Sequence, residues 1–476
     1  MLRIWLDVED MFQYAMANPR PSGIQRVEYE LCRALVERAP AGVEIRFLRH
    51  APMRNSFYGV PWSVFAALFE GMVSQAPRSP PPPRAAEPVR QGLVFRLLKA
   101  VAYRLPTGLR LGLTPVFVHQ RASLWAVRDL LRGAIRRRPP PVAPAVAAPA
   151  VAAPVAVAPP VAGDVFDREA RPGDVLAVLG SPWFHPDYGA LVARAQRERG
   201  LRFALLIYDL IPLRRPEFCD RGLIDLFARW VGQTLPLADI ILTISRASAA
   251  DVLRHAGDAA ITLRTVPRPI PMGTGFSRPA LPAGPRSARL PPPGSYALIV
   301  STIEARKNHV LLFRVWRRLL DEMPRAAVPT LVFAGRVGWL VADLMQQMRN
   351  AGFLGGKIRI VEDPTDGELA QLYDGCLFTL FPSFHEGWGL PVTESLAFGR
   401  PCVVAEATSL PEAGGTLARY FDPDSASDAL RVIREIIEDR PALDRWQRQV
   451  IETFKPVPWT AAADAVLAAV TAPAAG

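Results

Sequence analysis

Two glutamates, Glu386 and Glu394, flank a Gly-Trp-Gly-Leu-Pro stretch in the segment FHEGWGLPVTE, residues 384–394. Paired carboxylates are the usual equipment of acid–base chemistry. The apolar run CLFTLFPS before the segment predicts a buried strand. Pro391 suits the first residue of a helix that stops near Gly399. Glu386 is therefore expected in a loop at the end of a strand, and Glu394 in the first helical turn.

Glycines at positions 387 and 389 let the backbone approach a ligand closely, and the helix that follows offers free N–H groups to an anion. This combination favours a phosphate-bearing ligand. A simpler interpretation of Glu394 is an acid favoured by the helix dipole. A glycosidase would also need two carboxyls, about 5–9.5 Å apart across the scissile bond. The neighbouring helix N-terminus suits nucleotide binding better than activation of water.

The composition excludes several other classes. The 476 residues exceed one ordinary core, so two or more domains are expected. Four scattered cysteines form no C-x-x-C pair, which argues against a disulfide framework or a zinc site and fits a reducing cytosol. The N-terminus lacks the apolar run of a signal peptide, and no apolar run is long enough to span a bilayer.

The net charge of +11 is concentrated in one segment. Residues 84–138 contain 12 Lys or Arg and only two acids, Glu87 and Asp129. Pro/Ala-rich stretches at 76–88 and 138–163 flank this segment, so residues 76–163 are predicted to be an insertion. Within 89–138, cations alternate with apolar residues at helical spacing, which suits an anionic membrane surface. An ordinary amphipathic helix packed on its own domain remains the alternative.

Short apolar runs alternate with amphipathic helical stretches elsewhere in the chain. This alternation predicts an α/β protein with parallel sheets covered by helices on both faces. We expect one Rossmann-like domain over 1–282, a second over 295–455, and a C-terminal helix or tail over 456–476. A Pro-rich stretch at 278–294 is the expected linker. Ligands should bind in the cleft between the domains, at the carboxyl ends of the strands.

The segment HEGWGLPVTE resembles the E-x7-E motif of glycosyltransferase family 4, whose members are retaining enzymes with the GT-B fold. Two further stretches, EARKN and VFAGRVGWL, resemble the family's E-P-R-K-N and V-x-x-G-x-x-G-W patterns, and SLPEAGG resembles a later loop. The amino-terminal half is similar through RPSGIQRVEYEL, YDLIPLRRPEFC and LTISRASAADVL. The likeness covers residues 1–50 and about 174–470, and is strongest in the second half.

The resemblance implies roles for individual residues. Glu394 would bind the ribose hydroxyls of a nucleotide sugar, and Glu386 would lie beside the donor sugar and the leaving phosphate. Arg306 and Lys307 would neutralise the diphosphate, where charge develops as the glycosidic bond breaks. Other expected donor contacts come from the same motifs and from the first glycine-rich loop: Gly387, Trp388, Gly389, Leu390, Gly335, Arg336, Ser22 and Gly23.

One departure from the family pattern concerns the expected acceptor side. Tyr208 and Asp209 stand where the family usually has His-Asp. A tyrosine keeps a hydroxyl donor but is a poor base near neutral pH. His185, in another predicted strand-end loop, is a candidate replacement, although a lone loop histidine is more often incidental. Retaining enzymes of this type are thought to use the leaving phosphate itself as the base.

The sequence thus predicts a hexosyltransferase, possibly a mannosyltransferase, that extends a surface polysaccharide or lipid-linked glycan. A D-x-D occurs only as DPD at 422–424, which we interpret as a turn, so no metal and no other cofactor is expected. The expected location is the cytoplasm, peripheral to the plasma membrane. Two alternatives remain: an inactive scaffold with the same fold, and a nucleic-acid-binding protein suggested by the pI near 9.9. The charge map opposes the second, and no nucleic-acid partner is expected.

Overall fold

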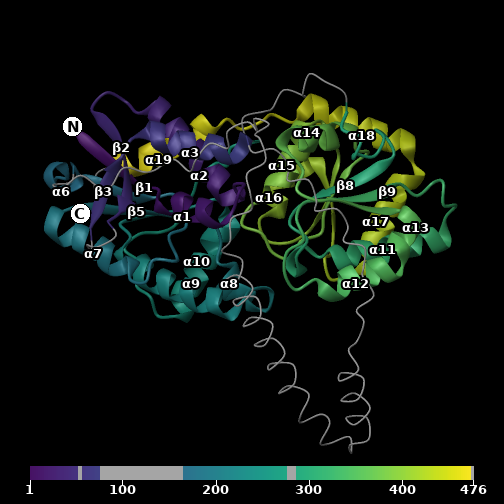
Figure 1. Ribbon diagram of the computed structural model, residues 1–476, viewed down its shortest axis with the longest axis horizontal. Coiled ribbons are helices and arrows are strands. Elements are labelled where there is room, and N and C mark those ends of the chain that lie inside the picture. The colour runs from purple at the N-terminus through teal and green to yellow at the C-terminus, as the bar shows by residue number, and fades with distance from the viewer. Residues whose placement is uncertain (52–55, 75–164, 276–285, 473–476) are drawn as a thin grey trace, which may run out of the picture. The chain divides into compact units, whose positions relative to one another are not determined.

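The computed structural model of the protein describes residues 1–51, 56–74, 165–275 and 286–472. These residues build two sheets (Figure 1). The strand order is β3-β2-β1-β4-β5-β6-β7 in one sheet and β10-β9-β8-β11-β12-β13 in the other. We call β1–β7 and the helices packed on them the first lobe, and β8–β13 with their helices the second lobe. The predicted insertion, with its proposed membrane segment, lies outside the described residues.

The first lobe has these strands: β1 Leu2–Asp7, β2 Val43–His50, β3 Phe57–Val60, β4 Val175–Val178, β5 Arg202–Ile207, β6 Ile240–Thr243 and β7 Arg268–Pro269. Its helices are α1 Glu9–Ala17, α2 Gly23–Arg38, α3 Trp62–Ser74, α6 Val165–Glu169, α7 Tyr188–Arg199, α8 Ile211–Arg214, α9 Arg221–Thr234 and α10 Arg246–Asp258, with 3-10 turns at Pro216–Phe218 and Leu235–Leu237. All strand pairs are parallel except β2 with β3.

The first-lobe sheet is buried on both faces because its strands are apolar at consecutive positions. On β1, Ile4 and Leu6 pack into the core with α1, α2 and α3, whereas Trp5 points into the core with α6, α7 and α9. Strands β4 and β5 alternate in the same way.

The second lobe has these strands: β8 Tyr296–Val300, β9 Thr330–Ala334, β10 Ile358–Val361, β11 Thr379–Phe381, β12 Cys402–Ala405 and β13 Ala418–Phe421, all parallel. Its helices are α11 His309–Glu322, α12 Ala342–Asn350, α13 Gly352–Gly356, α14 Asp366–Gly375, α15 Leu390–Ala397, α16 Leu410–Gly414, α17 Ala426–Glu438 and α18 Arg440–Thr453, with 3-10 turns at Ala305–Lys307 and Gly415–Leu417.

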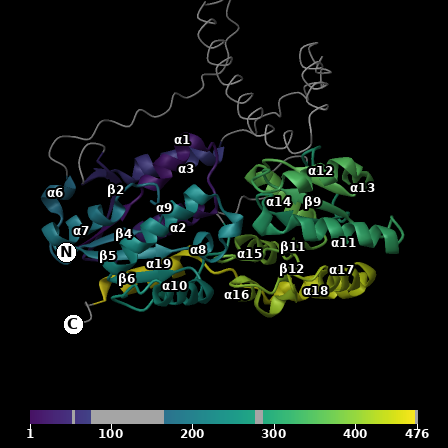
Figure 2. The same cartoon turned by 90° about the horizontal axis from the view of Figure 1, so that it is seen from below.

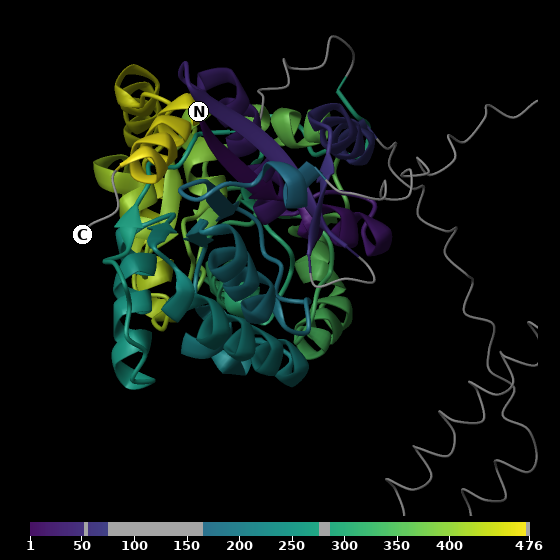
Figure 3. The same ribbon diagram turned by 90° about the vertical axis from the view of Figure 1, so that its left-hand side faces the viewer.

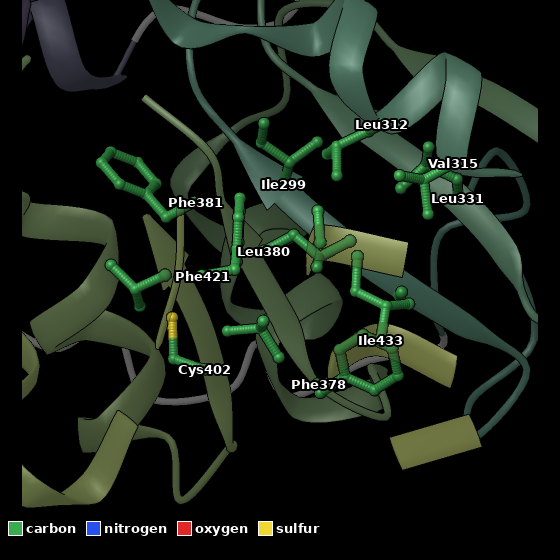
Figure 4. Packing of buried hydrophobic residues seen from close by; sticks show 14 of the residues in the cluster. Ile299, Leu312, Val315, Leu331, Phe378, Leu380, Phe381, Cys402, Phe421 and Ile433 are labelled. Carbon is green, nitrogen blue, oxygen red and sulfur yellow. The ribbon is translucent and has the colours of Figure 1, made fainter. Parts of the chain in front are cut away.

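Alternation along β8 and β9 again separates two cores. Ile299 and Leu331 pack with α11 and α17 (Figure 4), whereas Leu298 and Val332 face α14. Figure 1 shows α14 on one side of these strands and α11 and α17 on the other. Phe378, at 0% exposure, belongs to the larger of these two cores. Fully burying such a side chain stabilises a fold by roughly 1.5–3 kcal/mol.

The last helix, α19 Trp459–Thr471, returns to the first lobe (Figures 2 and 3). Its apolar face is buried in the core with α2, where Ala462 and Val466 are fully buried. Two hydrogen bonds join the outgoing and returning segments: Thr274 N donates to the Val457 carbonyl at 2.8 Å, and Val457 N donates to Thr274 Oγ1 at 3.0 Å. The expected C-terminal helix is therefore a structural part of the first lobe.

The apolar runs identified in the sequence correspond to β1, β4, β5, β6 and β8–β12. Strands β2, β3, β7 and β13 carry mixed or very short runs. Three of them, β3, β7 and β13, are edge strands, and β2 lies next to β3. Within the described ranges, no helix is long and apolar enough to cross a membrane.

Candidate active site

One cavity of about 1090 Å³ is lined by residues of both lobes. Its walls come from the segments that follow β1, β4 and β5 in the first lobe and β8, β9 and β11 in the second. The carboxyl ends of parallel strands are the usual position of a ligand site in such sheets. Thirteen of the fifteen residues singled out in the sequence line this cavity; Gly335 and His185 do not.

A buried ion cluster forms the second-lobe wall. Glu386 Oε1 lies 2.6 Å from Lys307 Nζ and 2.9 Å from an Arg306 guanidinium nitrogen. The other side of Arg306 pairs with Glu304 at 2.6 Å, and Arg306 also donates to the His385 carbonyl at 2.6 Å. Because Glu304 is only 2% exposed and Glu386 8%, the EARKN segment is not a solvated loop.

The electrostatics of this cluster are set by burial and by its own charges. Burial raises the pKa of Glu386, but Arg306 and Lys307 outweigh that effect and hold it at about 2. Burial, with Arg306 alongside, lowers the pKa of Lys307 below the usual value for lysine. Burial also raises the pKa of Glu304, against the attraction of Arg306. A phosphate bound here would contact two preorganised cations, Arg306 and Lys307, which are both already paired with Glu386.

Backbone contacts fix the loop that carries Glu386. Its N–H donates to Thr408 Oγ1 at 3.0 Å, and its carbonyl accepts from Ser409 Oγ at 2.9 Å. The Phe384 N–H donates to the Arg306 carbonyl at 3.0 Å, which joins the two charged loops. Thr408 and Ser409 were not identified from the sequence. The sequence contains little indication of this role, because a Thr-Ser pair at the start of SLPEAGG could serve many purposes.

Gly387 allows the lobes to meet closely. A Cβ at this position would lie 2.5 Å from the Tyr208 carbonyl oxygen, so only glycine fits without displacement. Ser248 Oγ, on α10, donates to that same carbonyl at 2.8 Å and lies 3.4 Å from the Gly387 carbonyl. The glycine therefore allows the two lobes to make close contact.

Glu394 faces the cavity from α15. Helix α15 begins at Leu390, so Pro391 is its second residue and Glu394 its fifth; the expected first-turn position is wrong by one residue. The helix-dipole explanation is correspondingly weaker, because that effect decays within one turn. Tyr373 donates a hydrogen bond to Glu394 Oε2 at 2.7 Å. Burial raises the pKa of Glu394, against this hydrogen bond. Tyr373 thus orients one oxygen and leaves Oε1 for a ligand.

The first-lobe glycine-rich loop lies opposite. Ser22 and Gly23 line the cavity, and a Cβ on Gly23 would be 3.7 Å from Leu390 Cδ1. Arg26 forms a two-pronged ion pair with Asp366 of the second lobe, at 2.7 and 2.9 Å. Its charge is therefore used to hold the lobes together.

Two expectations for the acceptor side need correction. Tyr208 contributes to the cavity wall, but its hydroxyl donates to the Leu179 carbonyl at 2.7 Å, and burial raises its pKa well above the usual value. The hydroxyl therefore points into the core, behind the wall. His185 is absent from the wall, because its ring packs edge-on against His50 at a centroid distance of 4.9 Å.

Gly335 supports the cavity wall without lining it. At φ +149°, a Cβ would lie 2.1 Å from the Ser301 carbonyl oxygen, so the residue keeps the ends of β8 and β9 in contact. Its neighbour Arg336 is exposed and lines the cavity.

Asp209 is half-buried at the cavity wall, and burial raises its pKa despite Arg306 and His385 nearby. Within the described part of the chain, no three His, Cys, Asp or Glu residues are grouped as metal ligands would be.

Comparison with known proteins supports this description of the second lobe. Residues 285–453 match the family model described as Glycosyl transferases group 1. The O-antigen chain mannosyltransferase B of Escherichia coli is 28% identical over 251 residues, which cover 52% of this chain and 63% of that protein. The serotype-specific mannosyltransferase WbdA of Escherichia coli is 26% identical over 252 residues, covering 51% of this chain and 30% of WbdA. The chain thus matches under two thirds of either relative.

Among solved structures, Anabaena HepE in complex with UDP aligns over 98% of this chain and 99% of its own, with a TM-score of 0.51 and 13% sequence identity. A likeness at this identity concerns the fold alone. The predicted architecture is confirmed: the protein has the GT-B fold, with two Rossmann-like domains.

Proposed function

We propose that the protein is a retaining, family-4-type glycosyltransferase that moves a sugar from a nucleotide-sugar donor to a glycan acceptor. The observation that carries the proposal is the Arg306–Glu386–Lys307 cluster, buried in a cavity between two Rossmann-like domains. Buried charges are expensive to maintain. Their presence at a strand-end cavity favours a function in which an anionic ligand contacts them.

The donor diphosphate would bind between Arg306 and Lys307, with Arg336 also on the cavity wall. Glu394 would accept hydrogen bonds from the ribose hydroxyls, oriented by Tyr373. The indole N–H of Trp388 is buried at the cavity wall with no hydrogen-bond partner among the described residues. A donor oxygen would satisfy it.

In the proposed reaction, the bond between the anomeric carbon and the leaving phosphate oxygen breaks while the acceptor oxygen bonds to the same carbon from the same face. The acceptor proton passes to the leaving diphosphate. Negative charge grows on the diphosphate as this happens, so the preorganised cations stabilise the transition state more than the ground state. Glu386 would hold both cations in place. We propose that the step requires no metal ion and no other cofactor.

We further propose that the acceptor is a growing surface polysaccharide or a lipid-linked glycan. The two mannosyltransferase relatives support transfer of a hexose and, among the hexoses, of mannose. Because such acceptors are commonly carried on lipids, we propose that the enzyme acts at the cytoplasmic face of the plasma membrane. Residues 89–138 would provide its contact with the membrane.

The test is a hydrolysis and binding panel with the whole protein. GDP, UDP, dTDP and ADP are compared by thermal shift, since a ligand that binds the folded state raises its stability. GDP-mannose, UDP-glucose and UDP-N-acetylglucosamine are then compared for hydrolysis. We expect stabilisation by one nucleotide and hydrolysis of its sugar conjugate. Binding without hydrolysis or transfer would indicate the inactive scaffold, and DNA binding without either would support the nucleic-acid alternative.

A further inference from the structure

A pair of buried carboxyl groups in the first lobe has no part in the chemistry described above. Asp10 is the second residue of α1, directly after β1, and it lines the cavity although only 6% exposed. Its Oδ2 accepts from the Ser181 N–H at 2.9 Å and lies 3.3 Å from Ser181 Oγ. Asp10 is thus fixed by the segment that follows β4.

Glu28, on α2, lies behind Asp10 and is fully buried. Apart from its contact with Asp10, neither of its side-chain oxygens has a hydrogen-bond partner in the described structure. No Lys or Arg of the described residues forms an ion pair with either carboxyl. Burial raises the pKa of both groups, that of Glu28 well above its usual value because Asp10 stands beside it. Burial thus favours the neutral form of Glu28, whereas the Ser181 N–H and hydroxyl favour the charged form of Asp10.

This arrangement is a poor way to stabilise a fold. A buried carboxyl without a cation costs free energy, and an apolar side chain of similar volume at position 28 would avoid that cost. Natural proteins keep such unfavourable buried groups mostly where function requires them. Here the exception places a carboxyl pair at the first-lobe side of the cavity, with Asp10 on the wall.

The two walls of the cavity differ in their charged residues. The second-lobe wall carries the cations Arg306, Lys307 and Arg336 together with the carboxylates of Glu304, Asp366, Glu386 and Glu394. The first-lobe wall presents Asp10 and Asp209, and its one cation in the described structure, Arg26, is paired with Asp366. Beside Asp10, the wall is made of Gln13, Tyr14, Ser181, Trp183 and Phe184. A carboxylate next to an amide and aromatic rings suits a sugar, whose hydroxyls need hydrogen-bond acceptors and whose C–H faces pack on rings. The same carboxylate repels an anion.

We propose that Asp10 accepts a hydrogen bond from the acceptor and that Asp10 and Glu28 together select an uncharged sugar terminus over a phosphorylated or carboxylated one. This inference rests on the proposed function and specifies its acceptor class. Glu28 is a positioning residue, because it acts only through Asp10. The reacting proton still leaves on the diphosphate, so Asp10 binds and orients the acceptor without taking its proton.

The first experiment needs no variant. With the donor found by the hydrolysis panel, transfer is measured to methyl α-mannoside, to mannose 6-phosphate and to methyl glucuronide. We expect kcat/KM for the neutral mannoside to exceed that for the phosphorylated sugar at least about tenfold, because juxtaposed like charges cost several kcal/mol. Equal use of the anionic sugars, or preference for them, overturns the inference. A protein that neither binds nor hydrolyses any donor would instead fail the proposed function.

Variants then identify the residues. Asp10→Asn should raise the acceptor KM roughly tenfold or more, through loss of a charge-assisted hydrogen bond, and should narrow the preference for the neutral sugar. Equal loss of transfer and of donor hydrolysis would place Asp10 at the donor and refute the inference. Glu37→Gln on α2 and Asp225→Asn on α9 are matched controls, because both remove an exposed carboxylate away from the cavity.

Glu28 is tested by two substitutions. Glu28→Gln keeps a hydrogen-bond donor to Asp10 and should retain an acceptor KM near that of the wild type, whereas Glu28→Leu removes the donor and should raise it. A residue that served only packing would show no such difference, because leucine fills the same core; equal KM values for the two variants would overturn the role of Glu28. Thermal melting reports folding of each variant. The wild-type acceptor panel decides the inference even if the Asp10 variant does not fold.

Discussion

Removing the amino group of Lys307 tests the proposed chemistry most directly. In the structure, Lys307 Nζ contacts one oxygen of Glu386, and Arg306 contacts the same oxygen. Lys307→Ala therefore leaves Glu386 paired with Arg306, so the buried carboxylate is not orphaned. We expect a stability loss below the roughly 3–5 kcal/mol that follows when a buried charge loses its only partner.

The expected loss of turnover is larger. If Lys307 stabilises the diphosphate charge that grows in the transition state, its removal should raise the barrier by about 3–4 kcal/mol, or roughly 100- to 1,000-fold in kcat. Nucleoside diphosphate affinity should fall much less, because Arg306 and Glu394 remain. The assay is steady-state release of nucleoside diphosphate, combined with calorimetric titration of the free nucleotide.

Lys357→Ala provides the matched control. Lys357 lies directly before the amino-terminal end of β10 and is not part of the cavity wall. Its side chain donates a hydrogen bond to the Val328 carbonyl. We expect Lys357→Ala to lower the melting temperature with little change in kcat. If Lys307→Ala keeps kcat within a few-fold of wild type, the diphosphate role belongs to Arg306 or Arg336, and the assignment of that role to Lys307 is refuted.

Glu394→Gln should weaken nucleotide binding by about 1.5–3 kcal/mol without unfolding the protein, because a charge-assisted bond to ribose is lost; unchanged affinity in calorimetric titration would argue against ribose binding. EDTA should leave transfer rates unaltered, whereas a strict metal requirement would contradict the proposed mechanism. The stability that Glu386 adds through its depressed pKa is present above its unfolded value near 4.5 and is lost as pH falls toward about 2. The difference in unfolding free energy between wild type and Glu386→Gln should therefore shrink between pH 6 and pH 2.5 in urea titrations; a constant difference would refute that assignment. Deletion of 76–163 should abolish flotation with anionic liposomes, where each cation contributes roughly 1 kcal/mol, while donor hydrolysis continues; equal flotation would exclude the segment as the membrane contact.

Much of the fold and site followed from local patterns. Buried parallel strands such as β5 and β8 are continuous apolar runs, and their ends must meet at one edge of a sheet. The loops with Arg306, Lys307 and Glu386 were therefore predictable neighbours before any distance was known. Glycine at 387 was also a clear signal, although the lobe contact it permits was not.

The remainder depends on contacts between segments distant in sequence. The Tyr208 hydroxyl could point into the cavity or into the core, and only the packing of β4 against β5 directs it to Leu179. Glu28 occurs in a helical pattern that any surface glutamate would fit, so its burial behind Asp10 had no local signal. Strand β3 pairs antiparallel with β2 at a sheet edge, where no periodicity indicates direction.

The return of α19 makes the second lobe an insertion within the first in terms of chain connectivity. The first-lobe core includes both Val27 from α2 and Val466 from α19, more than 400 positions apart. During synthesis on the ribosome, the second lobe can complete its own core before α19 has emerged, whereas the first lobe cannot. A fragment ending near residue 275 would leave the apolar face of α2 uncovered. Adding residues 456–472 as a separate peptide should cover that face and complete the first-lobe core. The second lobe, residues 286–455, is the part of the chain best suited to expression by itself.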